Sequence, residues 1–166
     1  LFISGMNSAL TPWMYSKIKK GDIRSMRKVL QLLSVVVVGI AVALMLISPE
    51  LVLIFGSPKY REAVYVIPPV AASVFFIFIY NILSMPQFYY EKTQFLMAAS
   101  MAAAGANVVL NFIFIRLFGY IAAGYTTLAC YMLYSVGHYI VSKRILVNEG
   151  IQENLMSPGF LAVSYT

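Results

Sequence analysis

Four stretches of this chain carry no Asp, Glu, Lys or Arg and are each long enough to cross a lipid bilayer. They run from Val29 to Pro49, Ala63 to Tyr90, Thr93 to Ile115 and Leu117 to Ser142. A bilayer contains about 30 Å of hydrocarbon, and a helix that rises about 1.5 Å per residue needs roughly 20 apolar residues to cross it. The pattern therefore predicts an all-α fold, a polytopic bundle of transmembrane helices. We expect the spans at 29–47, 64–87, 95–115 and 121–142.

The composition agrees with this prediction. Hydrophobic residues make up 61% of the chain and charged residues only 11%, against about one half and one quarter in soluble proteins. A soluble domain of this length still exposes about a third of the surface of its unfolded chain, so it has no place to bury so much apolar surface. The lipid bilayer is thus the expected partner, and the net charge of +6 does not indicate nucleic acid.

The basic residues predict the orientation of the bundle. Six of them lie in the segment KIKKGDIRSMRK, Lys17 to Lys28. Because Lys and Arg in short loops stay cytoplasmic, we place this segment inside the cell. Alternation of the four spans then puts Lys92, Lys143 and Arg144 on the same side. The basic residues left on the outer side are Lys59, Arg61 and Arg116.

The parts of the chain outside the spans are expected to differ from one another. Residues 1–28 are interpreted as a partial transmembrane helix followed by a basic cytoplasmic loop. Segment 48–63 contains Pro49, Gly56 and Pro58, and we expect it to lie along the outer interface or to dip into the membrane and return. Residues 145–166 form a polar tail that is expected to be truncated, and the start without an initiator Met also suggests a fragment.

Two features near the predicted membrane edges have two interpretations each. Pro68 and Pro69 at the start of the second charge-free stretch mark either an ordinary helix start or the hinge of a moving helix. Arg116 falls in the short turn of a helical hairpin at the outer edge. It is interpreted as a snorkelling anchor, with a substrate contact as the alternative.

Several pieces of the chain together resemble a known family. They are TPWMYSKIKKGD, LVLIFGSPKYREAVYVIP, YYEKTQ and NFIFIRLFGYIAAGYTTL, in this order and spacing. The set resembles the C-terminal half of bacterial oligosaccharide flippases, the polysaccharide biosynthesis transporters of the multidrug/oligosaccharidyl-lipid/polysaccharide exporter superfamily. The resemblance covers roughly Thr11 to Arg144.

The resemblance implies a two-lobed bundle of about twelve helices that works by alternating access. Such a transporter flips polyprenyl-pyrophosphate-linked oligosaccharide across the bacterial cytoplasmic (inner) membrane during surface polysaccharide biosynthesis. This chain would supply part of the C-terminal lobe, and the missing N-terminal lobe would be its partner. No cofactor and no metal are implied.

A sugar headgroup crosses hydrocarbon only if its hydroxyl groups keep hydrogen-bond partners. Asn107 and Asn111 are four residues apart and so share one helix face, and Asn81 with Ser84 forms a similar pair on the preceding span. Amides both donate and accept, as sugar hydroxyls require. These four residues are candidates for a transport cavity, with ties between neighbouring helices as the alternative.

Other side chains were also considered as candidates for binding or coupling. Tyr80, Tyr131 and Tyr134 lie well inside spans and can stack on sugar faces, with ordinary packing as the alternative; Tyr131 is our candidate for the cavity. His138 is interpreted as a partly wet interfacial side chain, with a proton relay as the alternative. Cys130 is single, so no disulfide framework is expected.

The basic segment supplies candidates for binding the pyrophosphate of a lipid-linked donor at the cytoplasmic mouth. Flexible lysines are good point-charge partners for phosphate, although the orientation rule explains the same residues. The candidates are Lys17, Lys19, Lys20 and Arg24.

Other function classes fit the residues less well than a flippase. A cation-coupled multidrug antiporter needs an intramembrane carboxylate, and no Asp or Glu falls inside a predicted span. An enzyme acting on polyprenyl-linked sugars needs acid–base or metal-binding groups on a water-facing loop, where Glu50 and Glu62 have no companions. We therefore expect no enzyme activity. The antiporter and an inactive truncated fragment stay as alternatives.

Overall fold

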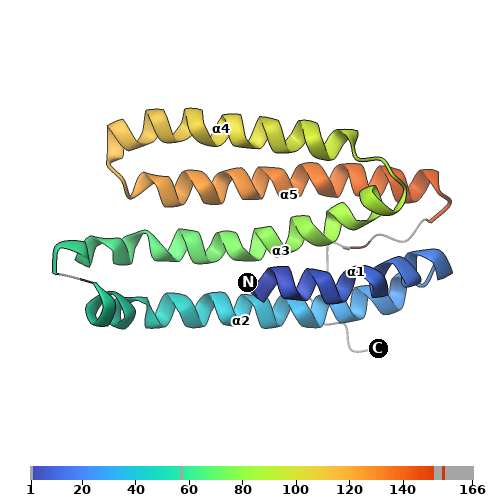
Figure 1. Ribbon diagram of the computed structural model, residues 1–166, viewed down its shortest axis with the longest axis horizontal. Coiled ribbons are helices and arrows are strands. Elements are labelled where there is room, and N and C mark those ends of the chain that lie inside the picture. Colours follow the sequence, from blue (N-terminus) through green and yellow to red (C-terminus); the bar gives the residue numbers. More distant parts are fainter. Residues whose placement is uncertain (1, 57, 152–154, 156–166) are drawn as a thin grey trace.

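The computed structural model describes residues 2–56, 58–151 and Leu155, and these residues form helices and turns without a β-strand (Figure 1). The helices are α1 (Phe2–Lys20), α2 (Ile23–Phe55), the 3₁₀ helix η1 (Pro58–Tyr65), α3 (Ile67–Tyr89), α4 (Gln94–Phe118) and α5 (Ala122–Asn148). The predicted all-α fold is therefore confirmed.

The long helices lie side by side in one row. Figure 1 shows α4 at one edge, followed by α5 and α3, with α2 and α1 at the other edge. α5 contacts both α3 and α4, α2 packs on α3, and α1 packs on α2 and α3. α3 and α5 are therefore each covered by neighbouring helices on two sides.

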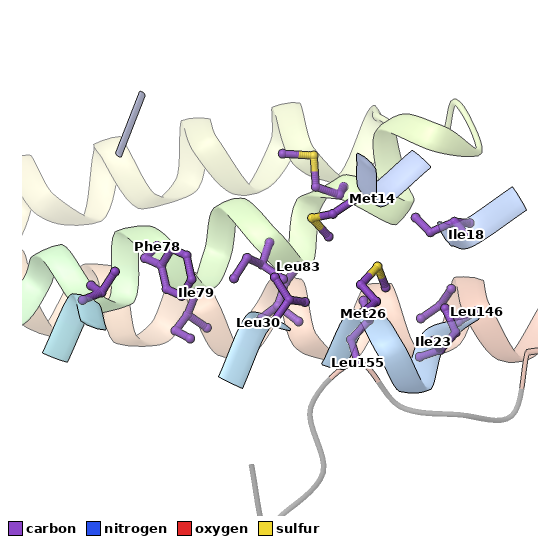
Figure 2. Packing of buried hydrophobic residues seen from close by; sticks show 13 residues of the cluster. Met14, Ile18, Ile23, Met26, Leu30, Phe78, Ile79, Leu83, Leu146 and Leu155 are labelled. Carbon is purple, nitrogen blue, oxygen red and sulfur yellow. The ribbon is translucent and has the colours of Figure 1, made fainter. Parts of the chain in front are cut away.

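The apolar core lies where α1, α2, α3 and the end of α5 meet (Figure 2). Met14, Met26 and Phe78 are fully buried there, and Leu146 of α5 and Leu155 join the same cluster. The core holds together the ends of helices that are more than 100 residues apart in the sequence.

In the part of the chain that the structure describes, three helices are long and apolar enough to cross a membrane. They cover Ile23–Phe55, Arg61–Tyr89 and Gln94–Phe118. The spans predicted at 29–47, 64–87 and 95–115 lie within them. α5 has 27 residues, about 40 Å of helix, but it is less apolar.

α5 lies between α3 and α4 and carries polar residues at buried positions. Its buried polar residues are Thr126, Ser135, His138 and Ser142. Ser135 Oγ donates a hydrogen bond of 3.0 Å to the backbone oxygen of Phe76 in α3. A helix that is sheltered by neighbours can carry such groups because they do not face hydrocarbon. Within the described residues, Ser142 Oγ and His138 Nε2 have no hydrogen-bond partner. The predicted span at 121–142 therefore remains our prediction for this helix.

The outer faces of the row are apolar and uncovered. Over Gln94–Phe118, α4 has no buried residue, and Val108 and Leu117 are each 68% exposed. Leu46 of α2 is 72% exposed. Helix faces made of so many exposed apolar side chains are unfavourable in water and suit a hydrocarbon solvent. Together with the three apolar helices, they indicate a membrane protein.

The alternating helices gather most of the cations at one end of the bundle, which we call the basic end (right in Figure 1). It comprises the ends of α1, α3 and α5 and the starts of α2 and α4. The nine basic residues predicted to be cytoplasmic all belong to these ends, and the three predicted to be outside belong to the opposite end. The loops between successive helices thus alternate between the two ends of the bundle, as the predicted orientation requires.

The predicted basic loop is mostly helical. Only Gly21 and Asp22 lie between α1 and α2, and Gly21 has a φ of 67°. Asp22 caps α2 by accepting a hydrogen bond of 3.2 Å from the Ser25 backbone N–H, and it also pairs with Lys17. The cations therefore lie on the last turns of α1 and the first turns of α2, because the cap starts the second helix at once.

Pro49 does not interrupt α2, which continues through it to Phe55. A proline inside a helix deprives the carbonyl four residues earlier of its N–H donor. Here that carbonyl belongs to Met45, and the hydroxyl of Ser48 donates to it at 2.8 Å. Ser48 thus replaces the missing donor. In segment 48–63, residues 48–55 are the end of α2 and residues 58–63 belong to η1.

The predicted tail also begins as helix. α5 extends to Asn148, and Ile145 and Leu146 are buried. Leu155 is buried in the core. Residues 152–154 and 156–166 lie outside the described residues.

Asp22 gives a pH-dependent prediction. Hydrogen bonds from Lys17 and then Ser25 lower the pKa of Asp22 from 3.8 to about 2. The ionised carboxylate therefore stabilises the fold above about pH 4, and this contribution is lost as the pH falls toward 2. We expect Asp22→Asn, which keeps a good capping residue, to lower the unfolding temperature in detergent at neutral pH. The difference in unfolding temperature between Asp22→Asn and the unsubstituted protein should become smaller below pH 4. A difference that stays constant down to pH 2 contradicts the prediction.

Candidate functional site

A groove of about 350 Å³, with several polar groups set in a mostly apolar lining, lies midway along the bundle, over α5 and between α3 and α4. We call it the mid-bundle groove. Its volume lies within the range of small-molecule sites. The lining residues are Tyr80, Ser100, Ala103, Ala104, Asn107, Thr127, Cys130, Tyr131 and Tyr134.

Three tyrosine rings form one wall of the groove. Tyr80 of α3 and Tyr131 of α5 are nearly parallel, with ring centroids 6.1 Å apart and an interplanar angle of 6°. Tyr134, one turn further along α5, lies 4.8 Å from Tyr80 at 59°. The face of such a ring is electron-rich and attracts the positively polarised edge of another group. The wall therefore offers ring faces and phenol hydroxyls to a ligand.

The other polar groups come from α4 and α5. The hydroxyl groups of Ser100 and Tyr134 are hydrogen-bonded at 2.6 Å across the two helices. Asn107 lies seven residues after Ser100, two turns along the same face of α4, and Thr127 adds a hydroxyl from α5. Amides and hydroxyls both donate and accept hydrogen bonds. A ligand with hydroxyl groups therefore finds partners of both kinds.

The two residues of the predicted pair Asn107 and Asn111 have different roles. Asn111 Nδ2 donates to Asn107 Oδ1 at 2.9 Å, and the hydroxyl of Thr126 bonds to Asn111 Oδ1 from α5. Asn111 thus ties α4 to α5, as in the packing alternative, and only Asn107 lines the groove.

The second predicted pair bonds within its own helix. Asn81 Nδ2 donates to the backbone oxygen of Ile77 at 2.7 Å, and Ser84 Oγ donates to that of Asn81 at 2.8 Å. Ser84 is buried, and neither residue is among the described residues that line the groove. The structure therefore does not bring Asn81 and Ser84 together with Asn107 and Tyr131.

Ser100 and Thr127 are groove residues that the sequence interpretation missed, and Tyr80 and Tyr134 were not chosen as cavity residues. The sequence spacing could have identified Tyr134, because Tyr131 and Tyr134 are three residues apart and so share a helix face. Tyr80 comes from another helix, so its place beside Tyr131 required the fold.

His138 is fully buried between α3 and α5, so the interpretation of a partly wet interfacial side chain is wrong. Its Nδ1 lies 2.8 Å from Nε2 of the buried Gln87. The Gln87 Nε2 group also donates to the Leu83 backbone oxygen at 3.2 Å. Because that nitrogen carries the protons, His138 Nδ1 accepts and the ring proton belongs on Nε2. The pair joins α3 to α5 near the basic end.

Pro68 and Pro69 lie in the first turn of α3, which begins at Ile67. Proline is favoured there because the first N–H groups of a helix have no partner within it. This position agrees with the helix-start interpretation. A hinge at Pro68 and Pro69 stays a prediction.

The phosphate candidates lie at the basic end, away from the groove. Lys17 pairs with Asp22, whereas Lys19, Lys20 and Arg24 are exposed. From Tyr134 in the groove, α5 continues for about 14 Å before it reaches Lys143. A phosphate role for the four candidates stays a prediction.

Arg116 lies at the opposite end of the bundle, in the last turn of α4. Its guanidinium is stacked on the ring of Phe112, 3.9 Å from the centroid. The chain then turns at Gly119, which has a φ of 74°. The position agrees with a snorkelling anchor, and Arg116 is not among the described groove residues.

No protein-family model, curated protein or solved structure matches this chain.

Proposed function

We propose that this chain is part of a membrane transporter that flips lipid-linked oligosaccharide from the inner to the outer leaflet. The resemblance to bacterial oligosaccharide flippases suggests this activity, and the bacterial cytoplasmic membrane is the proposed location. The mid-bundle groove is the observation that carries the proposal.

The groove lies where the barrier to a sugar is highest. An unpaired amide or hydroxyl in an apolar medium costs about 2–7 kcal/mol. Asn107, Ser100 and the phenols of Tyr131 and Tyr134 supply partners at mid-depth. A sugar in the groove therefore keeps hydrogen bonds that hydrocarbon cannot give.

The basic end has a separate role in the proposal. Before the donor is flipped, its pyrophosphate lies at the cytoplasmic surface and interacts with Lys19, Lys20 and Arg24, which are exposed there. Along α5, the groove residue Tyr134 lies about 14 Å from Lys143 at the basic end. A donor several sugars long can span this separation, with its phosphates at the surface and a sugar in the groove.

The three tyrosine rings also favour a second candidate, binding of a lipophilic organic cation. A cation over the face of an aromatic ring is attracted by about 0.5–2 kcal/mol. Tyr80, Tyr131 and Tyr134 offer such faces. An antiporter of the same superfamily is thus the alternative function, and the binding test below includes its ligand.

Ligand binding by the full chain in lipid nanodiscs tests the proposal. We expect a polyprenyl-pyrophosphate-linked neutral oligosaccharide to bind, and Tyr131→Ala and Asn107→Ala each to weaken binding by about 2- to 13-fold, the effect of 0.5–1.5 kcal/mol. Tyr125→Ala and Asn148→Ala change exposed residues of α5 outside the groove lining and should leave affinity unchanged. Binding of tetraphenylphosphonium without glycolipid binding would favour the antiporter.

A further inference from the structure

We infer that the mid-bundle groove selects uncharged sugars and disfavours acidic ones such as uronates. This inference rests on the proposed function and specifies the substrate class of the same site. The observation is the absence of charge around the groove: among the described residues that line it, none is Asp, Glu, Lys, Arg or His.

No described cation lies close enough along the helices to pair with a carboxylate in the groove. On α4, Arg116 is about 14 Å beyond Asn107, and on α5, Lys143 is about 14 Å beyond Tyr134. On α3, the turn after the helix places Lys92 at least about 15 Å from Tyr80. An ion pair requires a separation of about 4 Å between nitrogen and oxygen.

The described part of the neighbouring helices does not supply a cation either. α2 carries no charged residue from Val29 to Pro49, and α1 has none before Lys17. The described cations of the bundle thus lie at its two ends. A carboxylate at mid-depth is left without a counter-charge, which is unfavourable in a low-dielectric medium.

The ring faces add to this selection. The faces of Tyr80 and Tyr131 carry the negative part of the aromatic quadrupole, so they attract polarised C–H groups and repel a carboxylate. A neutral sugar presents C–H groups on its ring face and hydroxyls at its edge. Those hydroxyls match the amide of Asn107 and the hydroxyls of Ser100 and Tyr134.

The test compares two glycolipids that differ only in one sugar. The full chain in nanodiscs is titrated with a neutral polyprenyl-pyrophosphate oligosaccharide and with the same compound carrying one uronate in place of a hexose. The pyrophosphate is common to both, so its contribution cancels in the ratio. At about 0.15 M salt, which screens the basic end, we expect the neutral compound to bind at least about tenfold more tightly.

A second test introduces a positive charge into the groove. Thr127→Lys places an ammonium beside Asn107 and Tyr131, and it should narrow or reverse the preference. Thr127→Gln is the uncharged control of comparable length, and this variant should keep the preference for the neutral glycolipid. Circular dichroism of each variant checks that the helices are retained.

The outcomes separate the inference from the proposed function. Equal or tighter binding of the acidic glycolipid to the unsubstituted chain overturns the selection for neutral sugars and leaves the flippase proposal intact. Binding of neither glycolipid, or of tetraphenylphosphonium alone, overturns the proposed function and the inference with it.

Discussion

Gly124→Ala is expected to destabilise the bundle by about 1–3 kcal/mol, the usual cost of overpacking a close interface. A Cβ at this position would lie 2.9 Å from Pro69 Cγ, 3.2 Å from the Val66 backbone oxygen and 3.3 Å from Val66 Cγ1. The proline ring is rigid and the carbonyl belongs to the backbone, so neither moves aside easily. Gly124 therefore lets α5 approach the start of α3, and Gly124→Leu should have a larger effect.

Gly105→Ala is the matched control for this prediction. Within the described part of the chain, no atom outside the helix backbone lies within 4 Å of a Cβ added at Gly105. Alanine is favoured over glycine in a helix by about 1 kcal/mol, so this variant should be as stable as the unsubstituted protein or more so. The measurement is the unfolding of each variant in detergent, followed by circular dichroism. Stabilisation by Gly124→Ala contradicts the close approach of α3 and α5.

Single substitutions in the His138–Gln87 pair are expected to be strongly destabilising, and the double substitution is not. His138→Phe leaves one Gln87 N–H without a partner, and Gln87→Leu leaves His138 Nδ1 without one. Each unpaired buried group costs about 1–3 kcal/mol. In the double variant both polar partners are replaced by apolar groups, so its stability should lie closer to that of the unsubstituted protein.

A double-mutant cycle measures this coupling. Unfolding free energies of the four proteins should give an interaction energy of about 0.5–3 kcal/mol. Ser100→Ala provides a comparison, because Ser100 is exposed and bonds to Tyr134 on the groove side. Strictly additive effects at His138 and Gln87 contradict the bond between α3 and α5.

Much of the fold follows from the distribution of charge in the sequence. Charge-free stretches of bilayer length predicted helices that correspond to α2, α3, α4 and α5. The alternation of cations also predicted which helix ends lie together. These features were predictable because burial of charge in hydrocarbon is so unfavourable that it leaves a pattern along the whole chain.

Helix ends and individual side chains were less predictable, because they depend on local or distant partners. Pro49 does not end α2, since the hydroxyl of Ser48 bonds to the carbonyl that the proline leaves free. The buried His138 has a hydrogen-bond partner in Gln87, which lies 51 residues earlier in another helix. Asn81 is not among the described groove residues, and its amide bonds to its own helix.

Two of the residues that line the groove, Tyr131 and Asn107, are also candidates from the sequence. Asn107 is a candidate because amides both donate and accept hydrogen bonds, and Tyr131 because its ring can stack on a sugar face; both line the groove. Their companion Tyr80 comes from α3, whose packing against α5 brings the ring to Tyr131. Spacing along one helix identifies a face, whereas the groove is made by faces of three helices.

Labelling from one side of the membrane tests the central claim, that α2 to α5 cross the bilayer with the basic end in the cytoplasm. Single cysteines replace Lys20, Lys143 or Arg116 in a Cys130→Ala background, since Cys130 is the chain's own cysteine. In sealed vesicles, an impermeant maleimide should reach positions 20 and 143 from the cytoplasmic face and position 116 from the outer face. Labelling of positions 20 and 143 from opposite faces contradicts the four crossings.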